Sequence, residues 1–75
     1  MSAAYAVLLV DSTSHAIRIE KALVRAGIAC RLIPVPRQLS SDCGVCVRVR
    51  QEDSAAAQEL AAAAGVKIAG FRLLS

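Results

Sequence analysis

The sequence predicts an α+β fold, a ferredoxin-like two-layer sandwich in which a four-stranded antiparallel sheet carries two helices on one face. Apolar runs and helical periods alternate along the chain in the order β-α-β-β-α-β, which is the order of the split βαβ motif. The chain has 75 residues, a length that suits a single domain spanning residues 1–75. Apolar types make up 56% of the sequence, which is enough for a compact core in so short a chain.

The first strand and the first helix are predicted from the N-terminal third of the chain. Residues 5–10 form a short apolar run, and its length favours a buried strand. A helix is expected over residues 12–27, because Ser12 or Ser14 can cap its first turn and Gly27 can end it. The apolar stripe of this helix is expected to contain Ala16, Ile19, Leu23 and Ala26, widened by Ile17 and Val24.

Two further strands are expected in the middle of the chain, over residues 28–35 and 44–50. Pro34 and Pro36 cannot donate ladder hydrogen bonds, so the first of these strands leads there into a loop. Residues 44–50 alternate strictly, which is typical of a strand with one buried and one open face. The valines are expected on the buried face, and the open face receives Cys46, Arg48 and Arg50.

A second helix and a last strand complete the predicted fold. The alanine-rich residues 52–65 are expected to form the helix, which begins near Asp53 or Ser54. The last strand is expected over residues 66–74. Its apolar phase changes near Gly70, which predicts a bulge at that residue.

This topology predicts which residues meet at one end of the sheet. The first and second strands run parallel, so the loop after the second strand lies at the end where the first helix begins. Cys43 begins the third strand at that same end. We therefore expect Cys43 to lie close to Ser12, Ser14 and His15.

Cys43 is the strongest candidate for a reactive residue. It lies in a loop rich in serine, aspartate and glycine, and a thiol near a helix N-terminus or a cation is favoured as the nucleophilic thiolate. The cations expected nearby are Arg37, Arg48 and a protonated His15. Gly44 has no side chain, so a bulky partner can approach the sulfur closely.

The cysteine pattern does not favour a metal site. Cys43 and Cys46 form one C-x-x-C pair without a second pair, and Cys30 is expected at the other end of the sheet. The pair also precedes a strand, whereas thioredoxin-like chemistry needs it at the start of a helix. We therefore expect no metal and no cofactor, and we interpret Cys30 as a core residue.

Composition and charge limit the classes of partner. The net charge of +3 suits an anionic ligand or an acidic protein surface. The arginines form either a basic patch or ordinary solvated charge, and residues 44–50 contain no aromatic side chain, so no nucleic-acid partner is expected. No apolar run approaches the roughly 18 residues of a membrane span, and the start of the sequence lacks a basic leader, so we expect a cytoplasmic protein without a membrane partner.

Several stretches of the sequence resemble one known family. Residues 11–28 are similar to its first helix and the entry to that helix, residues 32–44 to its Pro-Arg and Ser-x-Cys-Gly motifs, and residues 64–74 to its ending. The family consists of short bacterial proteins described as selenium/sulfur carrier-like. The resemblance spans nearly the whole chain.

The most specific parts of the resemblance are Pro36-Arg37 and Cys43-Gly44. The resemblance implies delivery of sulfur or selenium, with a persulfide carried on Cys43. Cys46 departs from the family pattern, so it either resolves a persulfide or packs as a small strand residue. The Cys-Pro-x-Pro motif of the better understood sulfur-relay carriers does not occur in this sequence.

Two functions from different classes follow. The first is a cytoplasmic carrier that accepts sulfur or selenium on Cys43, where the amides of the first helix, Ser12 and Ser14 stabilise the anion. Its partners are donor and acceptor proteins, and it is not an enzyme in the turnover sense. The alternative is an oligomeric ferredoxin-like module that binds an anionic small ligand or a protein partner without covalent chemistry. Replacement of Cys43 by serine abolishes the first function and barely affects the second.

Overall fold

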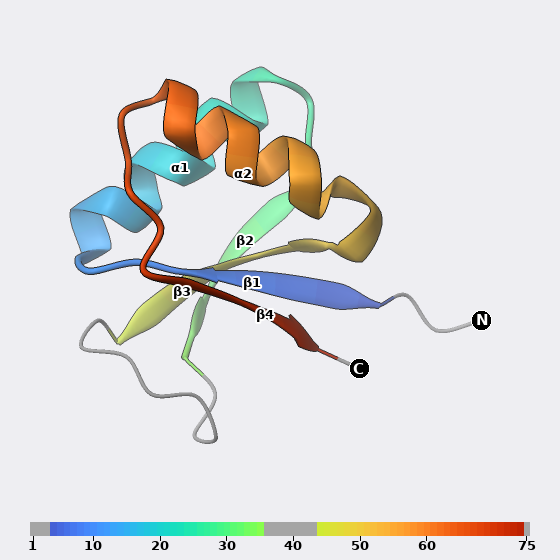
Figure 1. Cartoon of the computed structure of the whole chain (residues 1–75), viewed down its shortest axis with the longest axis horizontal. Coiled ribbons are helices and arrows are strands. Elements are labelled where there is room, and N and C mark those ends of the chain that lie inside the picture. Colours follow the sequence, from blue (N-terminus) through green and yellow to red (C-terminus); the bar gives the residue numbers. More distant parts are fainter. Residues whose placement is uncertain (1–3, 36–43, 75) are drawn as a thin grey trace.

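A computed structural model describes residues 4–35 and 44–74, which form one sheet and two α-helices (Figure 1). In chain order the elements are β1 (Tyr5–Leu9), α1 (Thr13–Arg25), β2 (Cys30–Pro34), β3 (Val45–Arg50), the 3₁₀ turn η1 (Gln51–Asp53), α2 (Ser54–Ala63) and β4 (Gly70–Leu74). The predicted order of strands and helices is confirmed.

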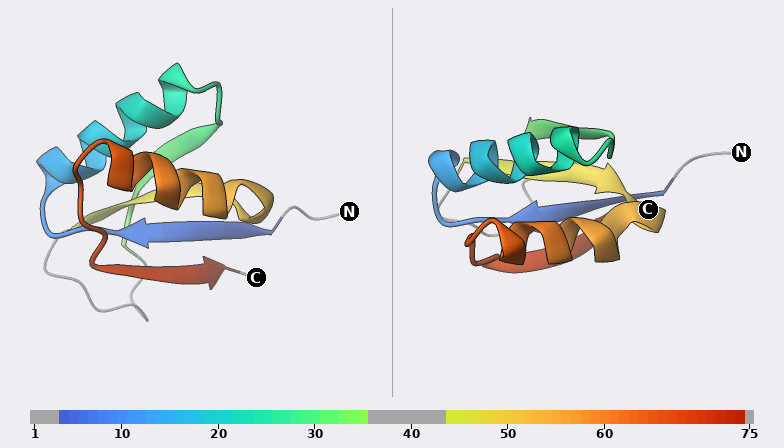
Figure 2. Two further views of the ribbon diagram at one scale, coloured as in Figure 1. Left: turned by 45° about the horizontal axis from the view of Figure 1, so that its top comes forward. Right: turned by 90° about the horizontal axis from the view of Figure 1, so that it is seen from above.

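The four strands form a sheet of order β2-β3-β1-β4, and every neighbouring pair is antiparallel. Both helices cover the same face of this sheet, which gives two layers (Figure 2). β1 and β2 both run antiparallel to β3, which lies between them, so they are parallel to each other. The predicted fold class is thus confirmed.

Helix α1 begins and ends where its local chemistry predicts. The side chain of Ser12 caps it by accepting a hydrogen bond from the backbone N–H of His15 at 3.3 Å. After its last turn, Gly27 has a φ of +81°, which costs glycine little and other residues more. The residues that α1 buries are Ala16, Ile19 and Leu23.

The apolar stripe of α1 is narrower than predicted. Ile17 is 39% exposed and Val24 is 64% exposed, so their expected burial is wrong. Each follows a buried position by one residue, which turns its side chain about 100° further round the helix and away from the sheet. Ala26 is exposed as well, because it is the C-cap residue beyond the last turn.

Strand β4 is shorter than predicted. Residues 66–69 form a connection that fills the core, since Val66 is buried and Ile68 packs against the same cluster. The register of β4 against β1 begins at Gly70, which stands opposite Leu9. The backbone N–H of Ala69 donates to the carbonyl oxygen of Leu9 at 2.7 Å, just before the strand begins. The change of apolar phase near Gly70 therefore marks the start of the strand, and the predicted start at residue 66 is wrong.

The main core lies between the sheet and the two helices. Helix α2 contributes Ala57 and Ala61 to it, and these small side chains let the helix approach the sheet closely. No helix within residues 4–35 and 44–74 has the length and apolar character needed to cross a membrane. The buried residues of this core are Ala6, Leu8, Val10, Ala16, Ile19, Leu23, Val47, Val49, Ala57, Ala61 and Val66.

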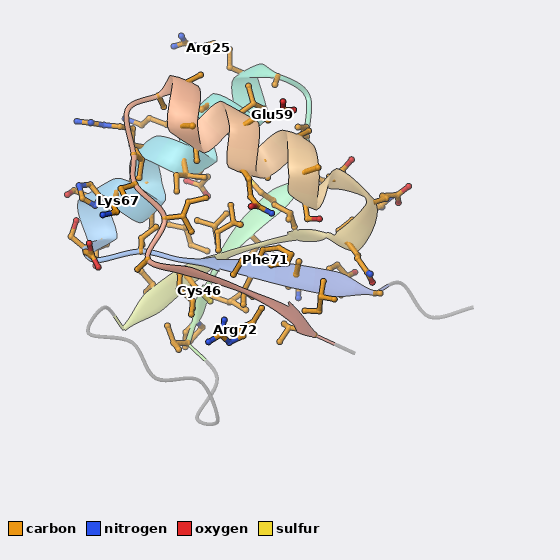
Figure 3. The ribbon with its side chains drawn as sticks, viewed as in Figure 1. Arg25, Cys46, Glu59, Lys67, Phe71 and Arg72 are labelled. Carbon is orange, nitrogen blue, oxygen red and sulfur yellow. The ribbon has the colours of Figure 1, made fainter. Side chains whose placement is uncertain are left out.

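The far face of the sheet, which is turned away from the helices, has an apolar half. Val7, Leu9 and Cys46 form a second buried group, the far-face cluster, against which Ile33, Val35 and Leu74 pack. Figure 3 shows Cys46 and Arg72 on this side of the sheet. Cys46 has the predicted direction but is fully buried, so the expectation of an open position is wrong. The reason is that apolar residues of β1 and β2 share the face with it.

Candidate functional site

One end of the sheet brings together the start of α1 and both described flanks of the segment that joins β2 to β3. Leu9, the last residue of β1, is paired with Cys46 of β3. Beyond this pair, the backbone N–H of Val35 donates to the carbonyl oxygen of Gly44 at 3.1 Å. Gly44, which directly follows Cys43 in the chain, is thus held at the end where β1 leads into α1 (Figure 1).

Two residues predicted for this site, Arg37 and Cys43, lie outside the described residues. Their placement and their roles stay predictions. The described part of the site consists of Ser12, Ser14 and His15 at the start of α1, and of Gly44, which directly precedes β3.

The start of α1 favours negative charge. Its first-turn amides lack partners within the helix and carry a partial positive charge. The hydroxyl oxygens of Ser12 and Ser14 lie 3.1 Å apart, and the first turn contains no acidic residue. Asp11 precedes the cap, but its side chain is exposed to solvent, where its charge is screened. This helix end is therefore suited to hold an anion.

His15 adds a buried polar atom that has no hydrogen-bond partner among the described residues. The residue is half-buried, and its Nδ1 is buried without a hydrogen-bond partner among the described residues. A buried polar atom of this kind costs free energy, so it is expected where a ligand or a reacting group completes the contact. His15 lies in the first turn of α1, where its backbone N–H donates to the Ser12 side chain, so this nitrogen belongs to the described part of the site.

Arg48 is not brought to this site. Its guanidinium carbon lies 4.3 Å from the centroid of the Tyr5 ring. Tyr5 is the first residue of β1, whereas the site lies beyond the last one. Cys46 does lie at the site's end of β3, but its full burial in the far-face cluster separates it from solvent.

The sequence was compared with families of known proteins. It matches the family model described as "Putative Se/S carrier protein-like" over residues 5–72. The chain belongs to this family. Comparison with curated proteins and with solved structures gave no match. The matched range contains α1 and both flanks of segment 36–43, so the candidate site lies within the Se/S carrier-like domain.

The second described thiol of this Se/S carrier-like protein lies at the other end of the sheet. Cys30 begins β2 opposite Val49, and its Sγ lies 3.9 Å from the backbone carbonyl oxygen of Glu20. Burial raises the pKa of the Cys30 thiol, and the Glu20 carboxylate raises it further. Cys30 packs against the main core, which confirms its predicted location. Both effects disfavour the thiolate, which is the nucleophilic form of the sulfur.

Within residues 4–35 and 44–74, no three side chains of histidine, cysteine, aspartate or glutamate are grouped so that they could hold a metal ion.

Sequence reasoning missed Tyr5, the aromatic residue of the far face. Tyr5 is two residues before Val7 of the far-face cluster, and the alternating residues Ala6 and Leu8 lie in the main core. This alternation within β1 is the signal that could have found it. The contact between Tyr5 and Arg48 is not visible in the sequence, because the two residues lie on different strands.

Proposed function

We propose that this chain is a carrier of sulfur or selenium in which Cys43 accepts the transferred atom. The single observation that best supports the proposal is the sheet end described above. There, at the end of the sheet where α1 begins, the carbonyl oxygen of Gly44, the neighbour of Cys43, accepts a hydrogen bond from the backbone N–H of Val35. At the same end, Nδ1 of His15 is buried and has no hydrogen-bond partner among the described residues. The family description points to the same chemistry.

The transfer needs one nucleophilic step. The Cys43 thiolate attacks the outer sulfur of a persulfide on a donor protein, so a new S–S bond forms as the donor's own S–S bond breaks. The donor cysteine leaves as a thiolate and takes a proton from solvent. Cys43 then carries a persulfide, and the transferred sulfur keeps its oxidation state. A selenium atom held on a donor thiol is passed on by the same displacement.

The residues at the start of α1 have roles in holding the product. A persulfide is more acidic than a thiol, so it is carried as an anion that the first-turn amides of α1 and the hydroxyls of Ser12 and Ser14 can stabilise. His15 and Arg37 assist as cations or hydrogen-bond donors. Gly44 leaves room for the donor and the acceptor protein, since a Cβ added there would meet no heavy atom of the described residues within 4 Å, apart from its chain neighbours.

The proposed setting is the cytoplasm, where thiols stay reduced and a carried persulfide can meet its acceptor. Cys46 as a resolving thiol would have to leave the far-face cluster before its sulfur could reach an adduct. Its burial therefore favours a packing role. The chain performs one transfer per loading and is a carrier between donor and acceptor proteins, not an enzyme in the turnover sense.

Sulfur loading tests the proposal directly. The reduced protein is incubated with a cysteine desulfurase and cysteine, and the intact protein and its peptides are weighed by mass spectrometry. A gain of about 32 Da, the mass of one sulfur, is expected on the peptide that contains Cys43. The Cys43→Ser variant should lose the adduct, whereas Cys30→Ser and Cys46→Ala should keep it.

Two results would reject the carrier. One is the absence of an adduct on the wild-type protein, and the other is an adduct spread evenly over the three cysteines. In either case the alternative function, an anion-binding module without covalent chemistry, becomes the better account of the chain.

A further inference from the structure

Three arginines lie in one transverse row on the far face of the sheet. Arg31 of β2 stands directly opposite Arg48 of β3, Arg48 is opposite Val7 of β1, and Val7 is opposite Arg72 of β4. Residues directly opposite each other in an antiparallel sheet point to the same side. The register thus places Arg31 and Arg48 directly opposite each other on neighbouring strands and on the same face of the sheet.

This arrangement is unfavourable in the absence of an anion. Like charges directly opposite each other destabilise a sheet, and the described carboxylates do little to offset them. Within residues 4–35 and 44–74, the one ion pair that involves these arginines or their neighbour Arg50 is Arg50–Glu52. Its atoms are 4.0 Å apart and its side chains 58% and 75% exposed, so it contributes little.

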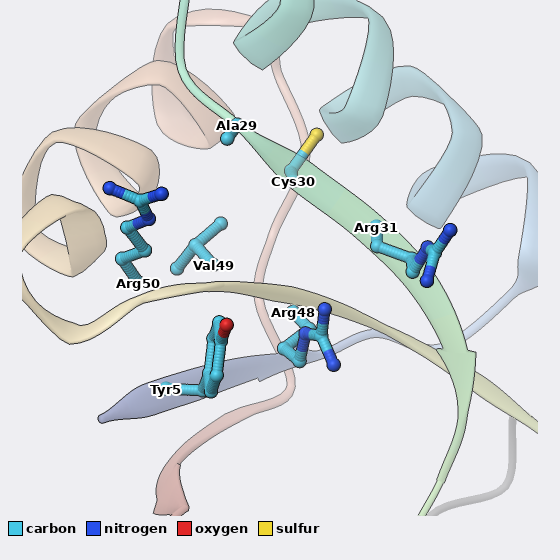
Figure 4. Close-up of a pocket in the computed structure, with 7 residues that line it drawn as sticks. All are labelled: Tyr5, Ala29, Cys30, Arg31, Arg48, Val49 and Arg50. Carbon is cyan, nitrogen blue, oxygen red and sulfur yellow. The ribbon is translucent and has the colours of Figure 1, made fainter. Parts of the chain in front are cut away.

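A pocket opens beside the paired arginines. It has a volume of about 230 Å³ and lies at the end of the sheet where β1 begins and β3 ends, with Tyr5, Arg31, Arg48 and Arg50 on its wall (Figure 4). The ring of Tyr5 supports Arg48, whose guanidinium carbon is 4.3 Å from the ring centroid. The contact holds one guanidinium in place before any ligand arrives, which lowers the entropy lost on binding.

We propose that this pocket binds the phosphate group of a small phosphorylated molecule. Arg31, Arg48 and Arg50, which line the pocket, carry more positive charge than Glu52, the carboxylate beside Arg50, can balance. A phosphate monoester carries a charge of about −1.5 to −2 at pH 7. The planar fork of arginine fits two phosphate oxygens at once. The volume is below the roughly 300–1,000 Å³ of pockets that enclose whole ligands, so the pocket takes the phosphate and leaves the rest of the molecule outside.

The pocket is separate from the proposed sulfur site. Its walls include the first residue of β1 and the last residue of β3, whereas the sulfur site lies beyond the opposite ends of those strands. Phosphate binding therefore does not depend on the carrier function. A protein with Cys43→Ser should bind phosphate as the wild type does.

The test is a titration of the ¹⁵N-labelled protein, followed by NMR through its backbone amides and arginine Nε–H groups at low salt. The probes are inorganic phosphate, adenosine monophosphate, adenosine and malonate. Phosphate and adenosine monophosphate should cause saturable shifts centred on Tyr5, Arg31, Arg48 and Arg50, and adenosine should cause none. Equal affinities for inorganic phosphate and adenosine monophosphate would show that the phosphate group alone accounts for binding. About tenfold tighter binding of adenosine monophosphate would identify a phosphate ester as the ligand.

Charge-matched variants separate the pocket from general basicity. Arg48→Gln and Arg31→Gln should each weaken phosphate binding about tenfold or more, because each removes a charged hydrogen-bond donor. Arg18→Gln removes the same charge from the exposed side of α1 and should change the affinity less than about twofold. Two variants are used because Arg48 is half-buried and its loss could disturb the sheet, while Arg31 is exposed.

Four results would overturn the proposal. The first is a titration that does not saturate by about 10 mM phosphate, and the second is malonate that binds as tightly as phosphate. The third is an equal loss of phosphate affinity in Arg18→Gln and Arg31→Gln. The fourth is a protein that binds an oligonucleotide but does not bind the monophosphate. The last result would indicate a surface for a nucleic-acid polyanion that uses the whole row, including Arg72.

Discussion

Two thiols of the described chain, Cys30 and Cys46, show how strongly the surroundings of a residue decide its chemistry. Cys46 is enclosed by apolar side chains of three strands, and Cys30 is half-buried against the main core, with the Glu20 carboxylate as a nearby charge. The setting of Cys30 raises the pKa of its thiol and so disfavours the thiolate. The proposed carrier function needs sulfur on Cys43 alone, so a disfavoured thiolate at Cys30 is consistent with it.

The raised pKa of Cys30 gives the first prediction. A pKa above the ordinary value of about 8.5 means less thiolate at any lower pH, so alkylation of Cys30 by iodoacetamide should be slow at pH 7 and rise to its plateau only at alkaline pH. Glu20→Gln removes the smaller of the two causes and should lower the midpoint of this pH–rate profile, without returning it to the ordinary value. The rates are measured by peptide mass spectrometry.

A matched control for this prediction is Glu59→Gln, which removes an exposed carboxylate from α2. Its profile should coincide with that of the wild-type protein. An unchanged midpoint in Glu20→Gln would show that burial alone accounts for the pKa, and a higher midpoint would contradict the assigned sign.

The sequence predicts the direction of single side chains better than their burial. Strict alternation in residues 44–50 correctly separates Val47 and Val49 from Cys46 and Arg48. It cannot show that Cys46 is covered, because the covering residues belong to other strands. Arg48 was expected beside the reactive loop for the same reason, since its stacking on Tyr5 depends on a pairing between strands.

At the scale of elements, helix α1 carries the described part of the candidate site. Its position depends on the Ser12 cap at one end and on Gly27 at the other, and both were predicted from sequence. The start of β4 was not predicted correctly, because Val66 and Ile68 have the spacing of strand residues while they fill the core as a connection. A helix cap depends on a few adjacent residues, so it can be predicted from the sequence. Whether two apolar residues form a strand or a connection that fills the core depends on the helices that pack over them.

The cap gives the second prediction. Ser12→Ala removes the oxygen that accepts from the His15 N–H and should lower the free energy of unfolding by about 1 kcal/mol. Ser14→Ala is the matched control, because the Ser14 hydroxyl contacts the Ser12 hydroxyl and, among the described residues, caps no amide. Its cost should be clearly smaller. Urea unfolding followed by circular dichroism measures both, and equal costs would show that the two hydroxyls share the capping role.

At the scale of the whole molecule, the two faces of the sheet have different characters. The face under the helices is entirely apolar in its buried residues, whereas the far face combines the far-face cluster with a row of arginines. The crowding of one sheet end could be predicted because it follows from strand order alone. The arginine row could not, since it depends on the register of β2 against β3 and of β4 against β1.

The row gives the last prediction, which concerns the stability of the entire chain. Arg31 and Arg72 both lie on edge strands and in the same row, but Arg31 faces Arg48 while Arg72 faces Val7. Arg31→Gln therefore relieves a direct repulsion and should raise the free energy of unfolding at low salt by a few tenths of a kcal/mol up to about 1 kcal/mol. Arg72→Gln, which removes the same charge, should not.

Salt separates this repulsion from other effects of the substitutions. Raising sodium chloride from about 10 to about 500 mM shortens the Debye length from about 30 Å to less than 8 Å, so the advantage of Arg31→Gln over the wild-type protein should shrink. Phosphate at low ionic strength should also remove the advantage, because it stabilises the paired arginines of the wild type by binding between them. An advantage that salt and phosphate leave unchanged would mean that the paired arginines do not repel each other, and the sheet would then have no electrostatic need for an anion.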